Sequence, residues 1–212
     1  MSFSHLKQQI LSCQLCQASL PNPANPIIQL DPQAKILIIG QAPGAKAHKL
    51  DTPFLDASGK RLREWLGVDE NQFYDETIFA IMPMGFCYPG KSNSGDLPPQ
   101  ERCAKEWHAL IWPHLTQVEL VLLVGQYAQQ SYLDNWQQLN PTSQLQAQLK
   151  DYATAYPRLT QRVYHNHELP NHIMCLPHPS PRNQIWVKKN DWFEREQLPL
   201  LKDRVKAVLT NN

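Results

Sequence analysis

The sequence predicts an α/β fold, in which a central, mainly parallel four-stranded sheet lies between helices in a three-layer α/β/α arrangement. Two observations lead to this prediction. Four short runs are apolar and rich in β-branched residues throughout, as is typical of strands buried on both faces. Between them, apolar residues recur with helical spacing, and strands that alternate with helices build a parallel sheet covered on both sides. At 212 residues the chain has the length of one domain, which we expect to span residues 1–212.

The expected elements alternate along the chain. Strands are expected at residues 35–39, 77–82, 120–124 and 172–176. Helices are expected at residues 59–66, 101–110, 126–133 and 192–209. Pro199 should mark the true start of the last helix or a kink in it, because proline has no N–H to donate. Residues 141–170 are polar and poorly periodic, and we expect a helical excursion with loops there.

Composition and charge favour a cytoplasmic protein. Residues 1–11 lack the continuous apolar stretch of a signal peptide, and no run approaches membrane-spanning length. Five cysteines without a secretory signal are typical of a reducing compartment, where thiols bind metals. The formal net charge of +1 excludes a general polycationic nucleic-acid binder, although short basic clusters suit a local phosphate-binding face. We expect a monomer.

Four cysteines form two pairs of unlike spacing, Cys13-x2-Cys16 and Cys87-x15-Cys103. A structural zinc site usually has two closely spaced cysteine pairs, each with two to four residues between the cysteines, and only the first pair here has that spacing. An iron–sulfur cube accepts widely spaced ligands, because the cluster itself bridges them. We therefore expect these four cysteines to bind a [4Fe–4S] cluster, with zinc as the less favoured alternative. Cys175 lies in an apolar run and is expected in the core.

The segments that follow the four strands carry the candidate site. They are residues 40–44, 83–87, 125–126 and 178–183. In a parallel sheet, ligands bind beyond the carboxyl ends of the strands, so these segments should gather at one edge.

The order of the motifs resembles that of the uracil-DNA glycosylase superfamily. Gly40-Gln-Ala-Pro-Gly44 is followed, after eight residues, by Pro53-Phe-Leu-Asp-Ala-Ser-Gly59, and together they resemble the first motif of the iron–sulfur branch, family 4. The cysteine pattern resembles that branch as well. His178-Pro-Ser-Pro-Arg-Asn183 is similar instead to the last motif of the single-strand-selective monofunctional branch. The resemblance, which spans residues 13–205, implies a monofunctional glycosylase that hydrolyses the N-glycosidic bond of uracil, or of another deaminated base, in single- or double-stranded DNA.

The resemblance and the reaction together assign roles. The base must be swung out of the helix, and Phe54 is expected to stack on it, although such an aromatic can also be a core residue. Gly40 and Gly44 would let the backbone approach the base closely. The backbone amides at Gln41 and Ala42, with a neutral His178, would stabilise the leaving base as an anion.

Further residues are expected to contact DNA or the base edge. Asn93 matches an Asn of the family near the base, and the expected DNA contacts are Ser58, Lys60, Ser180, Arg182 and Asn183. The two serines can instead cap helices. Ile185 or Trp186 is a candidate apolar wedge in the DNA groove.

The chain also departs from the family. Well-known members place an Asp or Asn that positions water where this chain has Ala42, and the acids that follow the motif in the iron–sulfur branch are replaced here by Ala45, Lys46, Ala47 and His48. We expect His48 to be a solvated surface residue rather than one that positions water. Residues 82–84 provide no amide to read the base, and the Arg-Arg-Ile-His insertion of covalently trapping relatives is missing. These departures leave open a second interpretation, a catalytically weak or inactive module that binds damaged or single-stranded DNA. A metal-dependent nucleotide hydrolase would need carboxylates at the strand ends, where the sequence supplies almost none.

Overall fold

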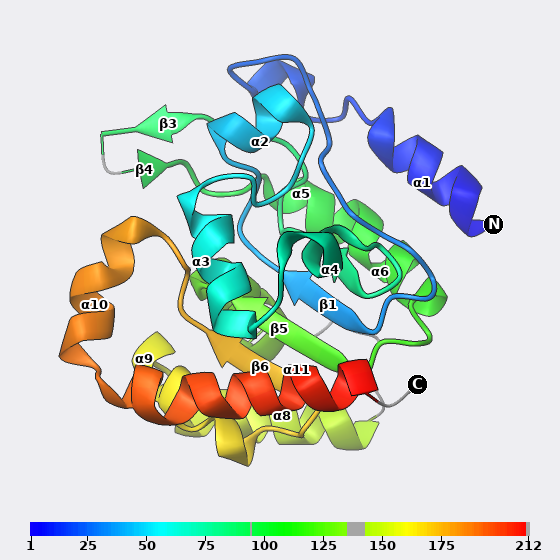
Figure 1. Ribbon diagram of the computed structural model, residues 1–212. Coiled ribbons are helices and arrows are strands. Elements are labelled where there is room, and N and C mark those ends of the chain that lie inside the picture. Colours follow the sequence, from blue (N-terminus) through cyan, green and yellow to red (C-terminus); the bar gives the residue numbers. More distant parts are fainter. Residues whose placement is uncertain (94, 135–142, 211–212) are drawn as a thin grey trace.

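The structure, a computed structural model, describes residues 1–93, 95–134 and 143–210. Its centre is a parallel sheet in the strand order β2-β1-β5-β6 (Figure 1). The strands are β1 (Ile36–Ile39), β2 (Phe79–Ile81), β5 (Leu120–Val124) and β6 (Ile173–Leu176). Every residue of these strands is buried, which explains why their sequences are apolar throughout. All four predicted strands and the α/β/α class are confirmed.

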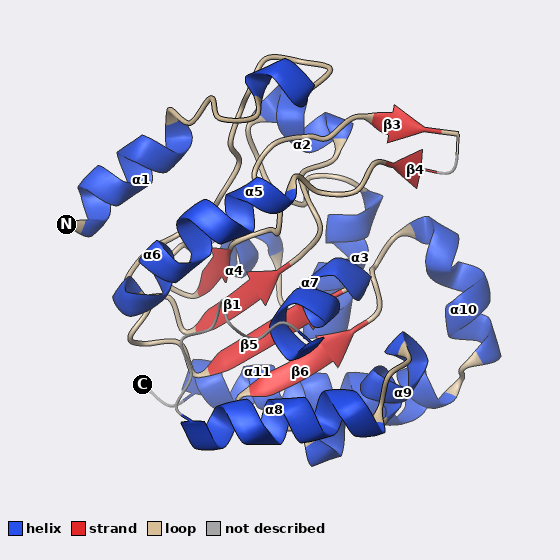
Figure 2. Cartoon of the chain, turned by 180° about the vertical axis from the view of Figure 1, so that it is seen from behind, coloured by secondary structure: helices blue, strands red, loops and turns tan. Residues whose placement is uncertain are grey.

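Helices cover both faces of the sheet (Figures 1 and 2). One face carries α3 (Ala57–Leu66), α4 (Glu70–Tyr74) and α11 (Leu198–Thr210). The other carries α5 (Glu101–Cys103), α6 (Ala109–Ile111) and α7 (Gln126–Gln129). The remaining α-helices of the described residues are α1 (Phe3–Leu11), α2 (Ala45–Leu50), α8 (Ser143–Ala155), α9 (Leu159–Tyr164) and α10 (Gln184–Lys189). Of these, α1 contacts α6, and α9 contacts β6.

Three of the predicted helices contain π-helical turns. These are Ala104–His108 between α5 and α6, Gln130–Asp134 after α7, and Phe193–Gln197 before α11. Pro199 is the second residue of α11, so its missing N–H falls where the α-helical pattern begins again, as predicted. Residues 143–170 hold α8, α9 and the 3-10 turn Asn166–Glu168, which agrees with the expected helical excursion; residues 141 and 142 of that range lie outside the described part.

The strand order creates a switch point between β1 and β5. The chain leaves β1 for β2 on one side, whereas β5 and β6 lie on the other side of β1. Connections that diverge in this way leave a crevice at the carboxyl ends of the two strands, which is where such sheets bind ligands. A short antiparallel hairpin, β3 (Lys91–Ser92) and β4 (Gly95–Asp96), projects on the same side of the molecule as α10 (Figures 1 and 2). No helix among the described residues is long and apolar enough to cross a membrane.

Candidate active site

A cavity of about 740 Å³ opens at the carboxyl ends of the strands. Most of the predicted site residues line it: Gly40, Gln41, Ala42, Gly44, Phe54, Ser58, His178, Ser180, Arg182 and Asn183. Two predicted residues do not. Lys60 is exposed on α3, and Asn93 is exposed in the turn between β3 and β4. The loops that follow β1 and β6 therefore meet in one cavity, as the parallel sheet predicts.

Phe54 has an unusual backbone conformation at the cavity wall. Its φ of +52° is in the left-handed region, which costs a non-glycine residue about 1–3 kcal/mol. Its ring lies against Gly40, where an added Cβ would be 3.3 Å from Cζ, and packs edge-on against Phe73 with ring centroids 6.2 Å apart. A strained conformation persists only where its surroundings fix it, so the contacts of Phe54 determine the orientation of its ring.

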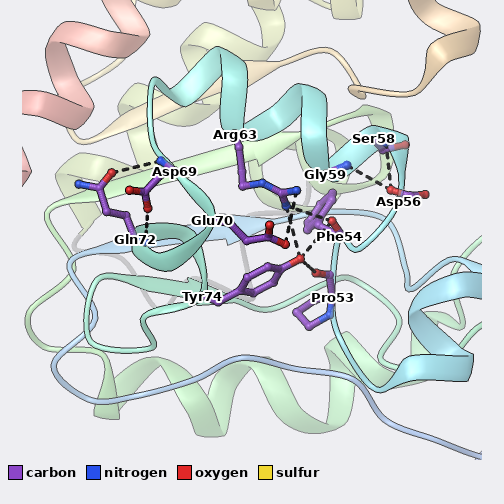
Figure 3. A network of polar contacts seen from close by, with 10 residues as sticks. All are labelled: Pro53, Phe54, Asp56, Ser58, Gly59, Arg63, Asp69, Glu70, Gln72 and Tyr74. Carbon is purple, nitrogen blue, oxygen red and sulfur yellow. Dashed lines mark hydrogen bonds and ion pairs between the residues drawn. The ribbon is translucent and has the colours of Figure 1, made fainter.

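The carbonyl of Phe54 is fixed by two donors (Figure 3). The Tyr74 hydroxyl lies 3.3 Å from this oxygen and 3.1 Å from the Pro53 carbonyl oxygen, and Arg63 Nη1 lies 3.5 Å from the Phe54 oxygen. Burial raises the pKa of Tyr74 against the opposing charge of Arg63, so the hydroxyl remains a donor. Arg63 is itself held by an ion pair with Glu70 at 3.9 Å.

His178 lines the cavity as a neutral hydrogen-bond donor. The Ser180 amide donates to its Nδ1 at 3.2 Å, which assigns the imidazole hydrogen to Nε2. Burial lowers the pKa of His178, opposed by the nearby carboxylates of Asp56 and Asp96. Asn183 Nδ2 donates to the His178 carbonyl at 2.8 Å, which holds the loop in place. Gly125 lies beside His178 and has a φ of +83°, a conformation that favours glycine.

The loop after β1 presents backbone donors. The carbonyls of Gly40 and Gln41 accept from the amides of Met84 at 2.9 Å and Gly85 at 3.0 Å. Within the described part of the chain, the amides of Gln41 and Ala42 have no acceptor. Backbone amides are nearly always paired, so two free ones that line a cavity are available to a ligand.

Two carboxylates also line the cavity, and sequence reasoning did not assign either of them to the site. Asp56 caps α3, because its Oδ1 accepts from the amides of Ser58 at 3.0 Å and Gly59 at 3.1 Å. The Oδ2 atoms of Asp56 and Asp96 each lie 3.7 Å from the point where a Cβ on Gly44 would stand. The segments that directly follow the strands supply no acid, as expected, and both carboxylates reach the cavity from other parts of the chain. Asp56 was visible in the second half of the first motif, but Asp96 comes from the distant hairpin.

The hairpin β3–β4 closes one side of the cavity. Gln41 Nε2 donates to the Leu97 carbonyl at 3.0 Å. Gly95 lies directly beneath Arg182, since an added Cβ would come within 1.8 Å of Nη1. On the other side, Arg61 Nη1 donates to the Ser180 carbonyl at 3.1 Å. The last motif is thus connected to both the hairpin and α3.

The structure separates the two candidate wedge residues. Ile185 is 68% exposed at the start of α10. Trp186 packs against Trp192 and Phe193, and its Nε1 donates to Thr160 Oγ1 at 3.0 Å. Trp186 therefore has a structural role, and Ile185 has a free side chain.

Ser180 caps the 3-10 turn Pro181–Asn183, where its Oγ accepts from the Arg182 amide at 3.3 Å. Ser58 is buried within α3, which Asp56 caps. His48 does not line the cavity, and it is half-buried at the surface rather than fully solvated. Its Nδ1 is buried without a partner among the described residues, and its ring lies 6.0 Å from that of Tyr88.

The four predicted ligand cysteines converge at one place. Cys13, Cys16 and Cys87 all lie within electrostatic range of Cys103. Burial raises the pKa of Cys87 to about 11 and that of Cys103 to about 12. Cys175 is fully buried in β6, as predicted.

Several neighbouring groups partly oppose the effect of burial on these thiols. The backbone of Asn25 acts to lower the pKa of Cys87, and that of Phe86 acts to lower the pKa of Cys103. The charge of Arg102 acts on Cys16 and favours its thiolate. Among the described residues, no three of the cysteine sulfurs lie within 4.8 Å of one another.

Comparison with known proteins agrees with this geometry. A sequence profile described as the Uracil DNA glycosylase superfamily matches residues 27–202. The Type-4 uracil-DNA glycosylase of Sulfurisphaera tokodaii is 27% identical over 92 residues, and this match covers 39% of each chain. The chain thus spans about two fifths of the length of that curated relative, whereas the profile includes all four strands and every loop that lines the cavity. The chain belongs to the Uracil DNA glycosylase superfamily.

Proposed function

We propose that this protein is a monofunctional DNA glycosylase that hydrolyses the N-glycosidic bond of uracil, or of another deaminated base, in DNA. The observation that carries the proposal is the meeting of three groups in one cavity: the Phe54 ring, the free amides of Gln41 and Ala42, and the neutral His178. Family membership and the name of the relative support the same activity. The cavity volume falls in the usual range for sites that bind small molecules.

The flipped base would stack on Phe54, and its carbonyl would face the donors. Negative charge develops on the base as the glycosidic bond breaks, and donors fixed in advance stabilise that charge most effectively. The Nε2–H of His178 and the two amides can act in this way without giving up a proton, since the pKa of His178 is lowered by burial. His178 would thus hold the departing base as an anion.

The sugar that remains acquires positive charge, and a water molecule must attack it. Asp56 is held by its two amide bonds and would supply a fixed negative charge beside the sugar. Asp96 would accept the proton of the attacking water. These two carboxylates compensate for the alanine at position 42, and they favour an enzyme over a binding module. No lysine lines the cavity among the described residues, which fits hydrolysis without strand cleavage.

DNA would lie across the cavity mouth. Arg182 and Lys60 would neutralise phosphates, and Ile185 would fill the space left by the extruded nucleotide. Ser58, Ser180 and Asn183 would act mainly through the loops that they order. Asn93 lies exposed at the hairpin tip, so we propose a contact with the DNA strand there rather than with the base.

The four cysteines fit a [4Fe–4S] cluster better than zinc. In a tetrahedral zinc site with Zn–S bonds of about 2.3 Å, all the sulfurs would lie about 3.8 Å apart. No three of these sulfurs come within 4.8 Å of one another, and an iron–sulfur cube needs wider spacing, because iron and sulfide stand between the thiolates. When bound, the cluster would act structurally and cross-link the start of the chain to the hairpin segment.

A base-release assay tests the proposal. Purified, cluster-containing protein is incubated with oligonucleotides that carry uracil, hypoxanthine or xanthine, either single-stranded or paired, and the free base is measured. Release of uracil with an intact abasic strand is the expected result. Binding of the uracil-containing strand without release of any base would instead identify a DNA-binding module.

A further inference from the structure

A compact group of metal-ligating side chains lies outside the cavity and apart from the cysteines. His165 Nδ1 lies 3.0 Å from Glu168 Oε1, and His167 Nε2 lies 3.7 Å from the same oxygen. All three ligand atoms fall within 4.8 Å of one another. They come from the turn that ends α9, and none of them lines the cavity.

The turn that carries these side chains is rigid. Asn166, between the two histidines, is fully buried. Its Nδ2 donates to the carbonyls of Val163 and Cys175 at 2.9 Å each, and its Oδ1 accepts from the Cys175 amide at 2.7 Å. The turn is therefore fastened to β6, and the neighbouring side chains leave it in fixed directions.

A neighbouring tyrosine orients two of the three ligands. The Tyr156 ring stacks on His165 with centroids 4.0 Å apart and planes inclined by 14°. Its hydroxyl donates to Glu168 Oε1 at 2.6 Å. Partners of this kind, which hold a ligand in place, are typical of metal sites.

We propose that His165, His167 and Glu168 form a surface site for a divalent transition-metal ion of the zinc class. Two imidazoles and one carboxylate are a donor set that Zn²⁺ favours. With Zn–N bonds of about 2.0 Å, tetrahedral ligand atoms lie about 3.3 Å apart. The separations of 3.0 and 3.7 Å from the two histidines to Glu168 lie on either side of that value, and the two histidine nitrogens, within 4.8 Å of each other, would close onto a bound ion by side-chain movement.

The exposure of the ligands defines the site further. The side chains of His165, His167 and Glu168 are 29%, 63% and 44% exposed, so an ion can enter from solvent and keep water at its remaining position. The carboxylate gives the group a negative charge that attracts a cation. A bound ion would join three side chains of the turn after α9, and because it binds this turn only when it is folded, it would stabilise the folded protein.

Zn²⁺ titration of the full-length, cluster-loaded protein tests the site. Calorimetry is compared between the wild type, His167→Asn, Glu168→Gln and the control His5→Asn, which removes an exposed histidine of α1. One equivalent of Zn²⁺ should bind to the wild type and the control, and at least about tenfold more weakly to the other two variants, as expected when a ligand is lost. Zn²⁺ should also raise the thermal midpoint of the wild type but not that of His167→Asn.

His167 makes its described polar contact only with Glu168, so its loss should leave the fold intact. Visible absorbance is followed during the titration, because a loss of absorbance would show that Zn²⁺ displaces iron from the cluster. Such displacement would be the same in all four proteins, so it cannot produce a difference in Zn²⁺ affinity between them. Equal Zn²⁺ affinity across the four proteins, at any cluster content, would overturn the proposal.

Discussion

Gly59 lies so close to Phe54 that a Cβ added to the glycine would stand 1.6 Å from the Phe54 carbonyl oxygen. That oxygen is the one that Tyr74 and Arg63 hold, so Gly59 is part of the mechanism that keeps Phe54 at its positive φ. The first turn of α3 and the backbone of Phe54 are therefore a single structural unit.

Replacing Gly59 by Ala should displace the Phe54 backbone and misplace its ring. We expect base release to fall at least about tenfold, because small displacements of a positioning group cost rate steeply. The matched control is Gly67→Ala, at the other end of α3, where φ is +72°. It should lower the free energy of unfolding by about 1 kcal/mol and leave the rate per folded molecule unchanged. Equal rates for both variants, measured with thermal unfolding as a check on folding, would contradict this role for Gly59.

His178→Ala should slow base release about 100-fold, the usual cost of losing a donor to a developing anion, while the affinity for DNA changes little. The pH profile gives an independent readout. Since burial lowers the pKa of His178 below its ordinary 6.5, the neutral donor persists as the pH falls through that value. The contribution of His178 to the wild-type rate should therefore stay level from pH 8 to below 6.5. An equal loss of affinity and rate in His178→Ala would place the residue in the DNA-binding surface instead.

Asp56→Asn and Asp96→Asn remove charge with little change in shape, and each should reduce base release about 10- to 100-fold. Asparagine is as good a helix cap as aspartate, so Asp56→Asn should preserve α3. Asp69→Asn is the matched control, because Asp69 caps α4 in the same way but lies outside the cavity. The measurement is the rate of base release at saturating substrate. Undiminished rates in both Asp56→Asn and Asp96→Asn would show that these carboxylates take no part in the reaction.

Purified protein should be brown, and Cys16→Ser or Cys103→Ser should lose the visible absorbance and lower the thermal midpoint. Cys175→Ala should keep the colour, since Cys175 lies in β6. Iron and sulfide analysis provides the measurement. A colourless protein with stoichiometric zinc at the four cysteines would show that the cluster assignment is mistaken.

Ile185→Ala should slow release from duplex DNA more than from single strands, because a wedge is needed only where the base must be extruded. Trp186→Ala should chiefly destabilise the fold, since the Trp186 ring packs against Trp192 and Phe193. The readout is the ratio of duplex to single-strand rates for each variant. An unchanged ratio in Ile185→Ala would rule out the wedge.

The sheet could be predicted because its strands are short, apolar and buried on both faces, so each is visible in the local sequence alone. The position of the cavity followed from the rule that ligands bind where parallel strands end. The acids could not be predicted in the same way. Asp56 has the local pattern of a helix cap, and Asp96 reaches the cavity only because the hairpin folds back to it. The positive φ of Phe54 depends on Gly59, Arg63 and Tyr74 together, which local pattern does not reveal.

The contact of Gly95 with Arg182 limits how this part of the chain can vary in length. Fifteen residues separate Cys87 from Cys103, and Gly95 lies midway between them. If both cysteines are anchored at the cluster, one inserted or deleted residue on either side would place a residue with a side chain at the Gly95 position, where φ of +135° favours glycine and where the end of the Arg182 side chain would have to move. Evolution or engineering can therefore vary the hairpin by substitution at exposed positions such as Asn93, whereas a change in its length would strain the backbone at Gly95 and displace the Arg182 side chain.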